Sequence, residues 1–373
     1  MQRQGDEVMV FAPGEGILEY HGARIERVPG LRFPLYPELT LALPSPAFRA
    51  KLQAFRPDVI HVADPALLGL AGIYYGDVLP LPLVISYHTR LPKYLHYYRL
   101  GALEPTVWKL MRVRHSRADV NLCTSTAMAE ELKAHGIERV QLWPRAVDTN
   151  EFHPRFADPE MRTFLSEGHP ECPLFVYVGR LSREKNIEAL RSVLDAIPAA
   201  RLAIIGGGPY KPALQSLFSN RPAFFAGYLT GERLAAAMAS ADALVLPSET
   251  ETLGLVLMEA MAAGSLVIGA NRGGIPDIIQ NEVNGLLFDT QHANGLPEAA
   301  RRVVVDPDLC QRLRAEARRQ AEGWSWAEAT RALRSYYRTA LTMPRGAKPA
   351  RANSFYVQAM KKAAIGGIKV FLR

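Results

Sequence analysis

The sequence predicts an α/β protein built from two Rossmann-like domains whose parallel sheets face each other across a cleft. Short apolar runs, which are typical of buried strands, alternate with longer segments that have a helical pattern. This alternation occurs twice, on either side of a proline-containing junction between His153 and Pro173. The chain of 373 residues is long enough for two domains, each with its own core.

The apolar runs place the strands of each half. In the first half they cover residues 7–12, 59–62, 83–87 and 120–123. In the second half they cover residues 174–178, 201–205, 223–226, 243–247 and 266–269. We therefore expect an N-terminal domain at 1–155, a C-terminal domain with a closing helix at 170–342, and a tail at 343–373. The cleft between the two domains is the expected binding site.

Composition is that of an ordinary globular protein, with 48% hydrophobic and 22% charged residues. No uninterrupted apolar run reaches the ~20 residues that a membrane-spanning helix needs. Cys123, Cys172 and Cys310 are scattered and odd in number, so we expect neither a disulfide framework nor a metal site. We find no signal peptide pattern and expect a cytoplasmic protein.

The net charge of +7 lies entirely in the tail, which has seven basic residues between Arg345 and Arg373 and no acidic one. A basic helix from Ser354 to Arg373 would bind the anionic inner face of a membrane. A disordered solubilising tail is the alternative, which Gly366 and Gly367 favour. Because the remaining basic residues gather on one aromatic surface, we expect no nucleic-acid partner.

Two carboxylates mark the start of one helix in the second half. Thr252 is predicted as the N-cap of a helix from 253 to 263, which leaves Glu251 in the preceding loop and Glu259 inside the helix. At ~1.5 Å per residue, the two carboxylates lie on the order of 10 Å apart, too far to share a proton. This spacing suits the two ends of one extended ligand, and the amides of Leu253 and Gly254 would meet phosphates between them.

A second cluster, Gly179, Arg180 and Lys185, follows the first strand of the second half. A glycine that clears the backbone and two cations near a helix start would suit a diphosphate. A solvated helix start is the alternative interpretation. The turn at 206–209 lacks the later glycine of the dinucleotide fingerprint, which argues against nicotinamide binding.

At these places the sequence resembles the family-four retaining glycosyltransferases of the GT-B fold, whose pattern of a glutamate, seven residues and a glutamate is matched by Glu251 and Glu259. The resemblance implies that Glu259 binds the donor ribose, while Glu251 and the backbone of 252–255 hold the transferred sugar. Arg180 and Lys185 would neutralise the diphosphate, and His88 would contact the sugar from the opposite domain. The implied donor site also includes Gly179, Gly207, Tyr228, Thr252, Leu253, Gly254 and Leu255.

Within that family, the chain is most similar to the sulfolipid synthases, which glycosylate diacylglycerol, and to related bacterial lipid glycosyltransferases. The similar stretches are residues 86–94, 142–155, 205–210 and 273–279. They indicate a lipid acceptor more strongly than they indicate the sugar, since enzymes that use mannose, glucose or galactose share much of the pattern. Arg145 would suit a sulfonate or, equally, an interdomain salt bridge. Ala146 departs from the family, which usually has glycine there.

The start of the chain also departs from the family. Members of this fold open with a strand, a glycine loop and a helix, whereas residues 1–6 resemble the end of that helix. We therefore expect a natural frame that begins upstream, or a first half that folds poorly.

The resemblance implies that the leaving diphosphate assists the acceptor hydroxyl, so that no protein nucleophile, cofactor or metal is required. The pair Asp306 and Asp308 mimics a metal motif, but Asp306 as N-cap and Pro307 as the first helical residue explain it more simply.

The segment 93–117 interleaves aromatic and basic residues and is the expected acceptor and membrane surface, with Tyr94, Tyr97, Trp108 and Arg112 as candidates. Burial of Trp108 in the domain core is the competing interpretation. Transfer to a soluble sugar and an inactive sugar-nucleotide binder remain as alternatives to lipid glycosylation. The absent first strand favours the binder, whereas four intact residues argue against it: Glu251, Glu259, Arg180 and Lys185.

Overall fold

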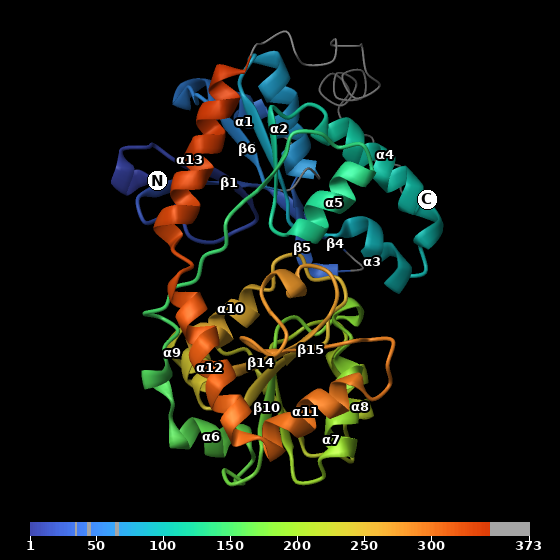
Figure 1. Cartoon of the computed structure of the whole chain (residues 1–373). Coiled ribbons are helices and arrows are strands. Elements are labelled where there is room, and N and C mark those ends of the chain that lie inside the picture. Colours follow the sequence, from blue (N-terminus) through green and yellow to red (C-terminus); the bar gives the residue numbers. More distant parts are fainter. Residues whose placement is uncertain (34–35, 43–45, 64–66, 344–373) are drawn as a thin grey trace.

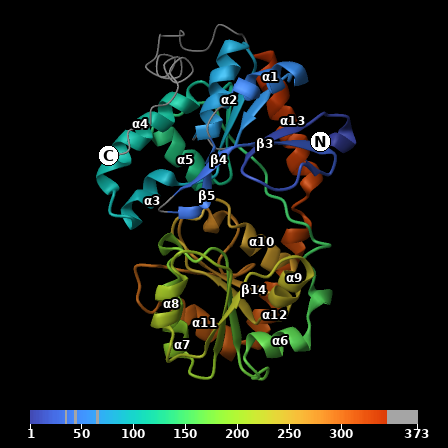
Figure 2. The same cartoon turned by 180° about the vertical axis from the view of Figure 1, so that it is seen from behind.

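The computed structural model describes residues 1–33, 36–42, 46–63 and 67–343. Figures 1 and 2 show two lobes stacked one above the other, the first in blue to teal and the second in green to orange. The predicted membrane-binding tail lies outside the described residues from position 344 onward.

The second lobe is built on a six-stranded parallel sheet with the order β12-β11-β10-β13-β14-β15. Its strands are β10 (Leu174–Val178), β11 (Arg201–Ile205), β12 (Ala223–Gly227), β13 (Ala243–Leu246), β14 (Leu266–Ala270) and β15 (Leu286–Phe288). Five of the six were predicted, and β15 was missed because three residues give too short a pattern. The central strands are apolar throughout because helices cover both faces of the sheet.

Helices surround this sheet on both sides (Figures 1 and 2). They are α6 (Pro159–Leu165), α7 (Arg191–Ala196), α8 (Lys211–Leu217), α9 (Gly231–Ala239), α10 (Leu255–Ala262), α11 (Gly295–Val305) and α12 (Pro307–Glu322). The N-cap prediction for α12 is confirmed, since Asp306 Oδ1 accepts a 3.0 Å hydrogen bond from the Leu309 amide and Pro307 opens the helix.

The first lobe carries a four-stranded parallel sheet with the order β6-β7-β8-β9. Its strands are β6 (Ile60–Val62), β7 (Leu83–Tyr87), β8 (Val120–Cys123) and β9 (Val140–Leu142). The helices of this lobe are α1 (Pro46–Phe55), α2 (Leu67–Val78), α3 (Leu91–Tyr97), α4 (Glu104–His115) and α5 (Thr126–Ala134). Short 3-10 turns complete the two lobes at Gln2–Gln4, Gly101–Leu103, Pro154–Phe156, Arg183–Lys185, Ile187–Leu190 and Ile275–Asp277.

The strand predicted at 7–12 forms but belongs to a different sheet. The strand β1 (Met9–Pro13) pairs in parallel with β3 (Ala23–Val28), which also pairs with β2 (Glu19–Tyr20). Among the described residues, β1 therefore does not join the four-stranded sheet of the first lobe, because β3 takes its hydrogen bonds. A separate hairpin joins β4 (Gly30–Phe33) to β5 (Tyr36–Ala42).

The last helix among the described residues, α13 (Trp326–Thr342), returns to the first lobe. Figure 1 shows this red helix running alongside the blue lobe, away from α12. Its buried residues Leu333 and Ala340 pack with Val84, Val120 and Leu122 of the first-lobe sheet. The helix α13, which follows the second lobe in the sequence, therefore contributes to the core of the first lobe.

Candidate active site

The loop between β13 and α10 carries the first carboxylate. The helix begins at Leu255, and Gly254 precedes it with a φ of 72°. The prediction of Thr252 as N-cap was therefore wrong by two positions, because the left-handed turn at Gly254 redirects the chain before the helix starts. The amides of Leu253, Gly254 and Leu255 have no acceptor within the helix, as expected at a helix start.

Glu251 forms a close ion pair with Lys185. The Oε2 atom of Glu251 lies 2.7 Å from Lys185 Nζ, and the two side chains are only 16% and 17% exposed. Burial alone would lower the pKa of Lys185, but the charge of Glu251 and its hydrogen bond raise that pKa above its usual value. The structure thus brings together a carboxylate and a cation that lie 66 positions apart in the sequence.

Glu259 lies in α10, in a different environment. Burial, and then the nearby charge of Glu151, raise the pKa of Glu259 to about 7. A ligand that donates hydrogen bonds to this carboxylate would stabilise its charged form. The two predicted glutamates therefore sit in contrasting surroundings, one ion-paired and the other without a cation that lowers its pKa.

Glycines let the segment after β10 approach the next strand closely. A side chain at Gly206 would come within 2.0 Å of the Gly179 carbonyl oxygen, which explains glycine at this position, where φ is 130°. A side chain at Gly207 would meet the ring of Tyr228 at 2.6 Å. Tyr228 is 71% exposed, so it covers Gly207 and offers one aromatic face to a ligand. Arg180 follows β10 and is also exposed.

His88 reaches the same region from the first lobe. It follows β7 and is exposed, and its backbone oxygen accepts a 2.9 Å hydrogen bond from Thr252 Oγ1. The backbone oxygen of Thr252 in turn accepts a 3.1 Å hydrogen bond from Thr124 Oγ1. The loop that carries Glu251 is therefore attached to both β7 and β8 of the opposite lobe.

The helix α3 turns two of the predicted acceptor or membrane residues toward the second lobe. Burial, opposed by Lys185 and reinforced by Glu251, raises the pKa of Tyr94, which therefore lies near that ion pair. Burial and the charge of Glu249 raise the pKa of Tyr97. The neighbouring Tyr98 hydroxyl donates to Glu184 Oε2 at 3.3 Å. The sequence predicted Tyr94 and Tyr97 as acceptor or membrane residues. Because α3 packs against the turn that carries Lys185, both lie near charged groups of the second lobe, and their contact with an acceptor stays a prediction.

Trp108 belongs to the core of the first lobe. It is 5% exposed, it stacks on His135 at 3.7 Å between ring centroids, and its Nε1 donates to Glu104 at 3.2 Å. Direct contact of Trp108 with a bilayer is excluded, and the competing interpretation of burial is confirmed. Arg112, one turn later in α4, is exposed.

Two residues that bridge the lobes, Arg90 and Asp277, were not identified as such in the sequence. Arg90 donates to Glu131 in its own lobe and, at 3.4 Å, to the Glu249 carbonyl oxygen of the other. Asp277 accepts from the Thr126 amide at 2.5 Å and pairs with Arg145 at 3.4 Å. Arg145 is thus in the interdomain salt bridge that was one of its two expected roles. Arg90 and Asp277 both lie in stretches that resemble the family, which was the available signal.

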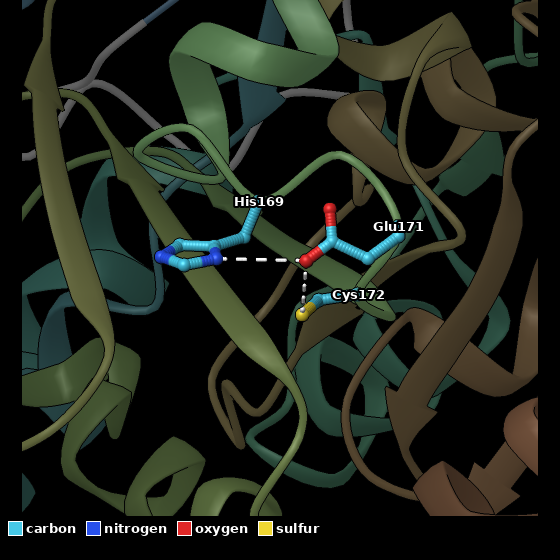
Figure 3. A group of neighbouring side chains, drawn as sticks. All are labelled: His169, Glu171 and Cys172. Carbon is cyan, nitrogen blue, oxygen red and sulfur yellow. Dashed lines mark hydrogen bonds and ion pairs between the residues drawn. The ribbon is translucent and has the colours of Figure 1, made fainter.

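A group of possible metal ligands lies elsewhere, on the turn before β10. Figure 3 shows His169 Nδ1 and Cys172 Sγ approaching one oxygen of Glu171, at 3.5 and 3.6 Å. His169 and Glu171 are exposed. All three residues lie on one short turn, apart from the pair of Glu251 and Lys185, so we assign them no part in the site.

Two family models together match most of the chain. The model for Glycosyltransferase Family 4 matches residues 1–151, and the model for Glycosyl transferases group 1 matches residues 165–320. Sulfoquinovosyl transferase SQD2 of Arabidopsis thaliana is 39% identical over 90% of this chain and 67% of its own length. A GDP-mannose-dependent alpha-mannosyltransferase of Mycolicibacterium smegmatis is 36% identical over 91% of both chains.

More distant relatives extend this similarity. Alpha-monoglucosyldiacylglycerol synthase of Streptococcus pneumoniae is 27% identical over 83% of this chain and 74% of its own length. Among solved structures, a sucrose-phosphate synthase from Thermosynechococcus elongatus covers 90% of both chains with a TM-score of 0.73 and 23% identity, which shows the same GT-B fold. From the two family models and the relatives above 30% identity, the chain belongs to the family-four glycosyltransferases, enzymes that act on nucleotide sugars.

Proposed function

We propose that the enzyme transfers a sugar, with retention of its configuration, from a nucleotide sugar to a membrane lipid. The observation that carries this proposal is the ion pair of Lys185 and Glu251 in a loop attached to the His88 backbone across the cleft. A cation for phosphate, a carboxylate for sugar hydroxyls and a histidine of the opposite lobe are thereby gathered in one place.

Each part of the donor has a proposed partner. Arg180 and Lys185 bind the diphosphate, together with the amides at the start of α10. Glu251 binds hydroxyls of the transferred sugar, and Glu259 binds the ribose hydroxyls. Tyr228 stacks on the base, for which its exposed face above Gly207 is suited.

The chemistry proposed for this site is mainly electrostatic. The leaving diphosphate accepts the proton of the acceptor hydroxyl on the face of the sugar that it leaves, while Lys185 and Arg180 stabilise its increasing charge. Because these cations and helix amides supply the positive charge, the proposal requires no metal ion and no other cofactor.

For the acceptor we propose diacylglycerol, with sulfoquinovose from UDP-sulfoquinovose as the first candidate donor. The support is the names of two relatives, a sulfoquinovosyl transferase and a monoglucosyldiacylglycerol synthase. The alternative is a hexose from GDP-mannose or a UDP-hexose, which the similarity to a GDP-mannose-dependent mannosyltransferase supports.

We further propose that α4 faces the inner, anionic surface of the membrane as part of a peripheral attachment. An open pocket of about 660 Å³ lies between α4 and the end of α5, with Lys109 and Arg112 in its wall. Around it, Leu100, Leu103 and Val113 are 47%, 49% and 41% exposed, a mixture of apolar and basic groups that suits a bilayer interface. Among the described residues, no helix is both long and apolar enough to cross a membrane.

The donor and acceptor are tested by mass spectrometry of lipids after incubation with diacylglycerol and each of UDP-sulfoquinovose, UDP-glucose, UDP-galactose and GDP-mannose. We expect one new glycolipid mass with one donor. Glu251→Ala should abolish it, whereas Glu249→Ala, in the same loop, should retain it. No lipid product with any donor, or equal losses in the two variants, would contradict the proposal.

The membrane surface is tested by sedimentation with vesicles that contain phosphatidylglycerol or only phosphatidylcholine. The enzyme should sediment with the anionic vesicles at low salt and be released at high salt. Lys109→Glu with Arg112→Glu should leave it in the supernatant. If the double variant sediments as the unchanged enzyme does, another surface is responsible.

A further inference from the structure

The helix α13 is linked to the proposed sugar site through aromatic rings. His61 is the middle residue of β6. Tyr337 in α13 and Ser86 in β7 contact its two ring nitrogens. The distances are 2.7 Å from Tyr337 Oη to His61 Nδ1 and 3.0 Å from His61 Nε2 to Ser86 Oγ. Both ring nitrogens of His61 are therefore hydrogen-bonded, and residues 276 positions apart are linked.

His61 is held in its neutral form. Burial, and then the charge of His88, lower the pKa of His61 to about 4. In a neutral imidazole one nitrogen donates and the other accepts, so the hydroxyls of Tyr337 and Ser86 must take complementary roles. Such a bridge fixes both the ring orientation and the tautomer.

Trp143 connects this bridge to His88. Its ring centroid lies 5.9 Å from that of His61 and 6.0 Å from that of His88, the latter at an angle of 61°. The Trp143 Nε1 donates to the Ala329 carbonyl oxygen in α13 at 3.3 Å. The helix α13 therefore holds both rings behind His88, while Thr252 holds the backbone of His88 from the other lobe.

We propose that His61 and Trp143 are positioning residues for His88, and that α13 completes the sugar site by holding them. The proposal rests on the proposed function, in which His88 contacts the transferred sugar. A histidine exposed on a cleft has many rotamers, and a packed ring behind it reduces them before the substrate arrives. In this proposal, the sugar is not contacted by His61, Trp143 or Tyr337.

The same helix offers a matched control. Tyr336, the residue before Tyr337, also donates a 2.7 Å hydrogen bond to the first lobe, from its hydroxyl to the Leu142 carbonyl oxygen. Tyr336→Phe and Tyr337→Phe each remove one oxygen and one hydrogen bond that attaches α13. Only the second variant disturbs His61.

The first experiment measures kcat and the donor KM of the full chain with the donor that yields product. Tyr337→Phe should lower kcat about tenfold with the donor KM within about twofold, whereas Tyr336→Phe should match the unchanged enzyme. Both variants should have similar melting temperatures. Equal kcat values in the two variants, or losses that follow the melting temperature, would overturn the proposal. If Tyr337→Phe does not fold, His61→Gln and Trp143→Phe replace it. Each should likewise lower kcat while the donor KM stays within about twofold.

The second experiment requires no substrate. In protein with ¹³C-labelled histidine, the His88 ring signal, assigned with His88→Asn, should shift or broaden in Tyr337→Phe and remain in place in Tyr336→Phe. An unchanged His88 signal in Tyr337→Phe would overturn the positioning role even if no transfer is found with any donor. Absence of transfer in the unchanged enzyme would instead count against the proposed function, so the two failures are distinguishable.

Discussion

Removal of the Glu251 carboxylate leaves Lys185 as a largely buried charge without its ion-pair partner. The two side chains are 16% and 17% exposed and 2.7 Å apart, so Glu251→Ala removes a close and mostly desolvated pair. Breaking a fully buried pair costs about 3 to 5 kcal/mol, and the remaining solvent contact reduces this to about 2 to 3 kcal/mol here. The second lobe should consequently melt about 5 °C lower.

A nucleoside diphosphate should recover part of this loss. In the unchanged enzyme Glu251 competes with the diphosphate for Lys185, and a like charge near a bound anion costs on the order of 1 kcal/mol. UDP or GDP, whichever binds, should therefore raise the melting temperature of Glu251→Ala more than that of the unchanged enzyme. With the complete sugar nucleotide, the rise in melting temperature of Glu251→Ala should exceed that of the unchanged enzyme by less, since the variant lacks the carboxylate for sugar hydroxyls.

The assay is differential scanning fluorimetry with and without UDP, GDP and the productive sugar nucleotide, beside transfer rates. Glu251→Ala should lower transfer by about 100-fold or more, and Glu249→Ala should change neither property greatly. If the nucleotide stabilises both proteins equally, Lys185 does not bind the diphosphate, and the donor site must be placed elsewhere.

Three further outcomes are expected. Because the folded state raises the pKa of Glu259 from 4.5 to about 7, the stabilising effect of its proton is complete below pH 4.5 and lost as the pH rises through 7. Above pH 7, denaturant unfolding should therefore give Glu259→Gln a free energy of unfolding on the order of 3 kcal/mol higher than that of the unchanged enzyme. The donor KM of the unchanged enzyme should rise as the pH falls from 8 to 6, because protonation removes the charge of Glu259. Asp277→Asn weakens the bridge between the lobes, so limited proteolysis of the segment between the lobes should become faster. Asp277→Glu keeps the charge and should therefore keep part of the resistance to proteolysis. Asp306→Ala should cost about 1 kcal/mol of unfolding free energy by removing the N-cap of α12, and an unchanged value would contradict the capping role.

Local sequence patterns were sufficient to predict most of the strands of the second lobe. Apolar runs of four or five residues between turns give β10, β11 and β14 directly, because a central parallel strand is buried on both faces. The separation of Glu251 in a loop from Glu259 in a helix was likewise readable, although the helix begins two positions later than expected. The left-handed residue at Gly254 decides that boundary, and a pattern of apolar residues does not reveal it.

Contacts between distant segments were not predictable in the same way. The segment 93–117 has the composition of a membrane surface, yet α3 and α4 turn different residues into the cleft, the core and the solvent. Tyr94 and Trp108 have similar chemistry, and only the packing of each helix against its neighbours separates one from the other. Composition can thus indicate that a segment is amphipathic without showing which partner covers each face.

The bonds across the cleft explain why two lobes with separate cores can act as one site. Thr252 donates to His88 and accepts from Thr124, so one loop residue is held by two strands of the opposite sheet. Neither bond uses a charged group, and both use a backbone oxygen, so the contacts depend on how closely the lobes approach rather than on the pH. Since α13 holds Trp143 behind His88 within the first lobe, the Glu251 loop meets a histidine that is packed on one side. In the proposed function, the second lobe therefore supplies the charges, and the first lobe supplies the surface against which they are aligned.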